Sequence, residues 1–318
     1  MGKCKIYTMI ALMLSLAVLA QADVVVKQKS SFSMAGVMDM EMNGTEYVKA
    51  DRNATETSTM MTGGMMAMFS DSAKEMLSTQ ITRLDKRVMW NVNVDDSTYS
   101  EMSFDRFKET ASEEPSGEQD EEEAEADMLG DPDQYDWTAQ VTSSDKPEDI
   151  NGFKCKNIIT TATGVSKTNP DDKAQIVFEY WYSKDVEGYD ELMNYRKAYA
   201  KATGVDMMEA NENTSMFFDR YGDQFKEMQD KITKAEGYPI KTVIVVKGTQ
   251  TGSAEEEDQQ GTAAGMQEMM RAMMGASEPE ASADGMVTIM SISNTIESIT
   301  KQPVDGSKFE VPAGFNEE

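Results

Sequence analysis

One stretch of sequence indicates the fold most clearly, Val88-Met89-Trp90-Asn91-Val92-Asn93-Val94. Its apolar residues at every second position, such as Val88, Trp90 and Val92, point to one side of an extended strand, and the asparagines point to the other. This alternation is typical of an antiparallel sheet with one buried and one solvated face. The acidic turn at residues 95–97 then predicts a neighbouring strand over residues 98–103.

The same pattern recurs along most of the chain. We expect further strands over residues 24–34, 37–42, 45–51, 54–61, 80–84, 135–141, 153–163, 173–182, 240–247, 286–299 and 309–311. Asn43-Gly44 is a strong hairpin signal and predicts a turn between the second and third of these. Helices are expected over residues 63–77, 189–202 and 214–235. Many strands with a few clustered helices predict an α+β fold with a mostly antiparallel sheet.

Two polar segments interrupt this pattern. Residues 109–133 contain twelve acidic residues and no lysine or arginine, and residues 249–284 are also polar and acidic. Such segments bury too little apolar surface to offset the entropy of ordering, so both are predicted to be disordered inserts. A calcium loop is the alternative for the first, although the Asp-x-Asp-x-Asp-Gly spacing is lacking. The rest of residues 23–318 is expected to form one domain.

The N-terminus reads as a secretory signal peptide. Lys3 and Lys5 precede an apolar run over residues 6–20, and Ala20-Gln21-Ala22 fits a cleavage site. The run is shorter than the roughly 20 residues that span a bilayer. Cleavage after Ala22 predicts a periplasmic or secreted protein with no remaining transmembrane segment.

Composition excludes several kinds of chemistry. The net charge of −27 becomes −29 when residues 1–22 are removed, since they carry two lysines and no acids; such a chain repels nucleic acid. The chain has no histidine, which excludes Ser-His-Asp and Cys-His nucleophiles and histidine-based zinc sites. The sequence contains neither the GxxxxGK(S/T) phosphate loop nor a GxGxxG motif after a strand. We therefore expect no enzyme activity and no cofactor, and Cys155 as a buried strand residue.

Methionine is unusually frequent, with 28 residues. One cluster lies over residues 60–68, and a second consists of Met266, Met269, Met270, Met273 and Met274. Three interpretations stay open: packing against the sheet, a pliable surface for apolar ligands or partner chains, and a Cu(I) site made of thioethers.

Several short segments together resemble an exported bacterial family called domain of unknown function 4412. They are YVKADR (47–52), LDKRVMW (84–90), TYSEM (98–102), NGFKC (151–155), EYWYSKD (179–185), GYPIKT (237–242) and FEVPAGF (309–315). The family is similar in pattern to periplasmic lipoprotein carriers of the LolA/LolB-like type. The resemblance implies a curved antiparallel sheet, or half-barrel, with helices packed on its concave side, and it supplies no catalytic residues.

The resemblance also implies an apolar hollow for a lipid or acyl chain. The residues expected to line it are Val88, Trp90, Val92, Phe178, Tyr180, Phe218, Tyr221 and Phe225. The sequence thus favours a non-enzymatic binding protein for an apolar small molecule or lipid outside the cytoplasm. The alternatives are a methionine-dependent Cu(I) binder, and a structural protein that contacts another protein of the cell envelope.

Overall fold

A computed structural model describes residues 23–64, 75–112, 134–204, 226–249 apart from 228, 229 and 233, and 285–318. Its strands are β1 (Val24–Met34), β2 (Met38–Lys49), β3 (Arg52–Gly63), β4 (Met76–Arg83), β5 (Val88–Asn93), β6 (Thr98–Ser103), β7 (Tyr135–Ile150), β8 (Phe153–Ser166), β9 (Lys173–Ser183), β10 (Tyr238–Thr249), β11 (Met286–Lys301) and β12 (Asn316–Glu317). The helices are α3 (Phe104–Ser112), α5 (Tyr189–Thr203) and the 3-10 helix η2 (Gly306–Phe309).

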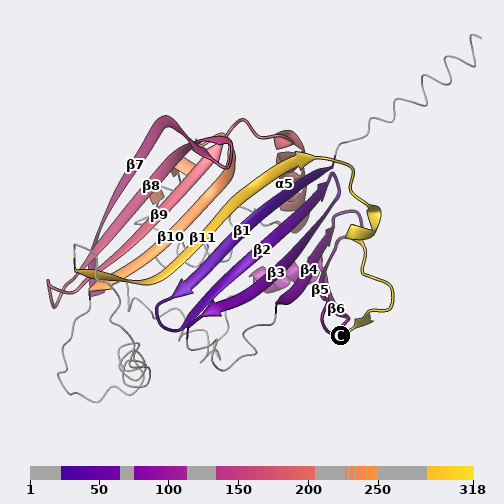
Figure 1. Cartoon of the computed structure of the whole chain (residues 1–318), viewed down its shortest axis with the longest axis horizontal. Coiled ribbons are helices and arrows are strands. Elements are labelled where there is room, and N and C mark those ends of the chain that lie inside the picture. The colour runs from indigo at the N-terminus through magenta and orange to yellow at the C-terminus, as the bar shows by residue number, and fades with distance from the viewer. Residues whose placement is uncertain are drawn as a thin grey trace, which may run out of the picture.

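The strands form one curved, unclosed sheet in the order β12-β6-β5-β4-β3-β2-β1-β11-β10-β9-β8-β7 (Figure 1). Neighbours in sequence pair from β1 to β6 and again from β7 to β11, and β1 pairs with β11 at the middle of the sheet. Among the described strands, all pairs are antiparallel except β12 with β6. The predicted α+β half-barrel is confirmed.

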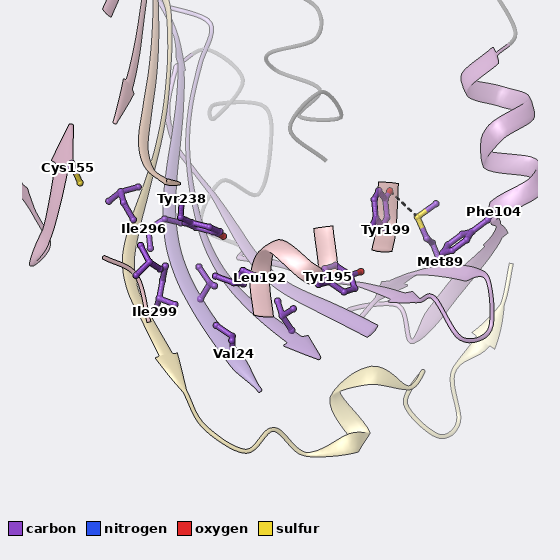
Figure 2. Close-up of a cluster of buried hydrophobic side chains, with 14 residues drawn as sticks. Val24, Met89, Phe104, Cys155, Leu192, Tyr195, Tyr199, Tyr238, Ile296 and Ile299 are labelled. Carbon is purple, nitrogen blue, oxygen red and sulfur yellow. Dashed lines mark hydrogen bonds between the residues drawn. The ribbon is translucent and has the colours of Figure 1, made fainter. Parts of the chain in front are cut away.

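The strand register defines the two faces. One line of paired residues across β1 to β5 contains Val24, Val48, Asn53, Thr82 and Met89. The neighbouring line contains Val25, Tyr47, Ala54, Ile81 and Trp90. Because successive side chains alternate, these lines point to opposite sides. The first faces α5, which lies inside the curve of the sheet (Figure 2), and this is the concave face.

The convex face of β3 to β6 is covered by the C-terminal residues 302–315, which we call the C-terminal strap. Phe309 is fully buried there with Ala54, Ile81 and Trp90. The Nη1 of the buried Arg83 donates to the Phe309 carbonyl at 3.3 Å and also pairs with Glu310. After the strap, β12 adds to the sheet edge beside β6.

The turn predicted at Asn43-Gly44 is wrong, and so is the strand predicted over residues 309–311, where η2 ends at Phe309. Asn43-Gly44 lies in the middle of β2, and the chain turns instead at residues 35–37 and 50–51. A Cβ on Gly44 would lie 3.0 Å from the Gln28 Cγ, so glycine serves here to admit a side chain of β1. Residues 63–77 were expected to form a helix, but Gly63 ends β3 and β4 begins at Met76; residues 65–74 lie outside the described part.

The predicted inserts fall mostly outside the described residues. Of the first, residues 109–112 belong to α3, so a helix occupies its start, and residues 113–133 are not described. Of the second, Thr249 ends β10 and residues 250–284 are not described. The turn predicted at residues 95–97 is confirmed, as part of a turn over residues 94–97, and another turn lies at residues 84–87; Arg87 and Ser97 take positive φ values of 56° and 55°.

We expect the Arg83–Asp85 pair to stabilise the folded protein at neutral pH and to lose this contribution in acid. Hydrogen bonds from Arg83 lower the pKa of the Asp85 carboxyl to about 2 from the model-peptide value of 3.8. An acid with a lowered folded-state pKa stabilises the protein above its unfolded pKa, and this is lost as pH falls from about 4 to about 2. In urea titrations over that range, Asp85→Asn should remove a contribution below about 1 kcal/mol, because Asp85 is one-third exposed. The exposed Asp171→Asn is the control, and an equal loss there contradicts the assignment.

Candidate functional site

Helix α5 crosses the inside of the curved sheet. Leu192, Tyr195 and Tyr199 recur at steps of three and four, which places them on one buried face of the helix. They pack against Val24, Val26 and Val48 of the sheet, and the Tyr199 hydroxyl lies 3.9 Å from the Met89 Sδ (Figure 2). The helix predicted over residues 189–202 is confirmed. The contacts of α5 with β1 and β2 lie at the start of the first strand and at the end of the second.

The helix begins at the predicted residue, Tyr189, and ends one residue later than predicted, at Thr203. Gly188 and Gly204 both take left-handed φ values, 74° and 81°, and the Gly204 N–H donates to the Ala200 carbonyl. Asp190 and Glu191 occupy the first turn and Lys201 the last, which suits the helix dipole. The Glu191 carboxylate also pairs with Lys301 of β11 at 2.6 Å. Both ends of α5 are thus fixed by backbone geometry and charge in addition to the packing of its apolar face.

A polar group lies beneath α5 on the concave face. The Asn53 Nδ2 donates to Glu46 Oε1 at 2.6 Å, and the Arg196 guanidinium lies 4.6 Å from the centroid of the Tyr238 ring. Burial raises the pKa of the Glu46 carboxyl above its usual 4.5, against the opposing charge of Arg196. Burial also raises the pKa of Tyr238 to about 12, so its phenol stays neutral. The floor under α5 is therefore polar, although Glu46 is held at an energetic cost.

We expect Glu46→Gln to stabilise the protein at neutral pH. Because the folded-state pKa of Glu46 is raised, its charged form costs stability as pH rises from 4.5 through that pKa. Glutamine keeps an acceptor for Asn53 and removes the buried charge. Thermal unfolding should show a higher melting temperature for the variant than for the wild type at pH 7. Below pH 4.5 the two melting temperatures should be equal. Glu41→Gln, on the other face of the same strand and paired with Lys29, should show no gain.

Beyond α5, the concave face carries an apolar band. Paired residues run across six strands from β9 to β3, in the order Phe178, Ile244, Ile292, Phe32, Met40 and Met61. On the β9 and β10 side the band is core, since Phe178 and Ile244 are buried with Ile232 and Ala235. From Ile292 to Met61 the band is only half-buried. This half-buried part, which we call the open band, is the candidate binding face.

The structure divides the residues that were expected to line a hollow. Phe178 and Tyr180 lie on the concave face but are buried in its core cluster. Val88, Trp90 and Val92 do share one face as predicted, yet it is the convex face beneath the C-terminal strap. The structure therefore does not bring the two groups together. Phe218, Tyr221 and Phe225 lie outside the described residues, as do Met266, Met269, Met270, Met273 and Met274.

The open band was missed by sequence reasoning, although a signal for it exists. Residues 38–42 read Met-Asp-Met-Glu-Met, so methionine and acid alternate with a period of two. That pattern puts the acids on the convex face and the methionines on the concave face. Asp39 accepts a hydrogen bond from the Ser33 hydroxyl, and Glu41 pairs with Lys29.

Three further features could indicate a function: the cysteine, a cluster of metal ligands or a membrane-spanning helix. Cys155 is fully buried in β8, which confirms its predicted place, and burial raises the pKa of its thiol to about 11. Within the described ranges, no three Asp, Glu, Cys or His side chains gather closely enough to hold a metal ion. The described helices include none with the length and apolar character of a membrane span.

No protein-family model and no curated protein matches the chain, so the resemblance to domain of unknown function 4412 is not supported by a family model. Among solved structures, the chain is similar to a LolA superfamily protein from Nitrosomonas europaea, at 9% identity over 92% of this chain and 91% of that one, with a TM-score of 0.23. A DUF1329 family protein from Desulfovibrio piger is similar at 9% identity over 94% and 95%, with a TM-score of 0.21. At these TM-scores nothing about this chain is inferred from the two proteins, and the half-barrel fold is established by the strand order of the sheet.

Proposed function

We propose that this protein is a non-enzymatic binding protein for an apolar ligand, a lipid or acyl chain, that acts outside the cytoplasm after cleavage behind Ala22. The open band carries this proposal. It places Ile292, Phe32, Met40 and Met61 side by side on the concave face, half-buried and outside the cluster that α5 forms with Val24, Val26 and Val48. A surface of this kind gains free energy by covering its apolar area with another apolar group.

The chemistry of the band suits a flexible hydrocarbon. Each CH₂ buried from water contributes about 0.8 kcal/mol, so a chain that lies across several strands gains affinity with length. Methionine side chains repack around ligands of different shape. The neighbouring positions Ser30 and Asn294 are polar and could receive the polar end of such a ligand. This arrangement favours recognition of a chemical class over a single molecule.

Export fits the same proposal. The Oδ2 of Asp23, the first residue after the predicted cleavage site, accepts a hydrogen bond from the Val304 N–H at 2.7 Å. Strand β1 then starts at Val24. Cleavage after Ala22 would therefore leave the whole sheet intact and free of the apolar leader.

The test combines native mass spectrometry with a fluorescent fatty acid. Protein purified from its host should carry lipid, and the emptied protein should take up the probe. The double variant Phe32→Asn/Met40→Asn places amides in the open band, where unpaired polar groups cost about 1–3 kcal/mol each, so probe affinity should fall at least about tenfold.

The matched control is Ser33→Asn/Glu41→Asn, which changes the same two strands on the convex face and should leave probe affinity unchanged. Absence of co-purified lipid together with no probe uptake contradicts the proposal. Equal losses in the two double variants would place the ligand elsewhere.

A further inference from the structure

We propose that the concave face holds a thioether site for Cu(I), formed by Met38, Met40 and Met61 with Met34 as a fourth donor. Seven methionines from five adjacent strands share this end of the face, namely Met34, Met38, Met40, Met42, Met61, Met76 and Met290. The proposed donors are strand residues, and none of them belongs to the methionine cluster over residues 266–274.

The register fixes how these donors lie. Met34 is paired with Met38 across β1 and β2, and Met40 is paired with Met61 across β2 and β3. Directly opposite side chains have Cβ atoms about 4.5–5.5 Å apart, within reach of two flexible thioethers that share one ion. Met38 and Met40 are next neighbours on the same face of β2, about 7 Å apart along the strand. Three or four sulfur atoms can therefore converge above β2.

A bulge lies at the same place. The register between β2 and β3 shifts between Asp39 and Met40, so that Asp39 pairs with Gly63 while Met40 pairs with Met61. Bulges bend a strand locally and re-aim the side chains beside them. Met38, Met40 and Met61 are all half-buried, so none of the three side chains is fully enclosed by the sheet.

Among the described residues of β2, the two acids that alternate with these donors are directed away from them. The acids that alternate with the methionines, Asp39 and Glu41, point to the convex face, where Ser33 and Lys29 hold them. Neutral thioethers without carboxylate or imidazole select Cu(I) and disfavour Zn²⁺, Mg²⁺ and Ca²⁺. The net charge of −27 raises the local concentration of any cation.

The test is Cu(I) titration of the full chain from its host in competition with bicinchoninate, under anaerobic reducing conditions. Met38→Leu/Met40→Leu/Met61→Leu removes three donors and keeps the apolar volume. Loss of an outer-shell partner alone costs about 10–100-fold in metal affinity, so the tightest site should weaken by more than about 100-fold. The control triple variant Met60→Leu/Met102→Leu/Met193→Leu should keep the wild-type affinity, since Met60 adjoins Met61 but points to the other face.

A second measurement needs no variant. Bound Cu(I) should protect Met38, Met40 and Met61 of the wild-type chain from peroxide oxidation in peptide mapping, while Met60 oxidises as before. X-ray absorption should show sulfur donors only. Failure of the wild type to compete for Cu(I), an unchanged affinity in the first variant, or protection confined to Met266–Met274 would each overturn the site. Because leucine keeps the band apolar, fatty-acid uptake should survive in that variant, which separates this proposal from the lipid-binding one.

Discussion

Phe309→Ala is expected to lower the free energy of unfolding by about 3–5 kcal/mol, the usual cost of removing a fully buried phenylalanine ring. The ring is 0% exposed and fills the convex cluster with Ile81 and Trp90. Lys49 Nζ also lies 5.3 Å from its centroid. Loss of the ring should release the C-terminal strap from β3 to β6. Urea unfolding of the variant and the wild type measures the difference directly.

Phe315→Ala is the matched control, because Phe315 belongs to the same cluster but is only half-buried. Its cost should be clearly smaller. Limited proteolysis adds a second measurement: cleavage within residues 302–315 should speed up in Phe309→Ala alone. If the two alanine variants lose equal stability, Phe309 is not the anchor of the strap.

Leu192→Ala is expected to cost about 2–5 kcal/mol and to loosen α5 from the concave face. Leu192 is 2% exposed and packs in the same cluster as Val24, Val26 and Ile299 (Figure 2). Helix α5 is also held at its first turn by the Glu191–Lys301 pair. Hydrogen exchange should therefore show the C-terminal turns of α5 opening first.

Lys197→Ala, on the exposed side of the same helix, controls for the loss of helix content and should stay within about 0.5 kcal/mol of the wild type. A wild-type exchange pattern in Leu192→Ala would show that α5 is held by something other than this side chain. A large effect of Lys197→Ala would mean that the helix itself is marginal.

The fold could be predicted from sequence because its signals are local. The period-2 pattern of residues 88–94 and the apolar steps of α5 each report which side of an element is buried. The hairpin expected at Asn43-Gly44 failed for a non-local reason. Gly44 is required by the close approach of the Gln28 side chain from the neighbouring strand, and the sequence of residues 37–51 alone does not show that contact.

The candidate site was harder to predict because alternation shows two faces without saying which one is concave. Trp90 and Phe178 are both aromatic residues within alternating strands. The C-terminal strap covers Trp90 on the convex face, whereas Phe178 is buried in the cluster on the concave face. The methionines of β1, β2 and β3 become neighbours only through the strand register. Pairing of that kind is a property of the whole sheet.

The position of β1 bears on how the chain can be made. Its two neighbours are β2, which follows at once, and β11, which is among the last parts to be synthesised; Asp23 is tied to a residue 281 positions later. Pairing at such separation is slow because loop closure precedes any gain from contacts. A ribosome would release nearly the entire polypeptide before its first strand found its second partner. Under the proposed export, the chain should therefore stay translocation-competent during synthesis and complete its sheet only after translocation, which pulse-chase experiments with stalled C-terminal truncations can measure.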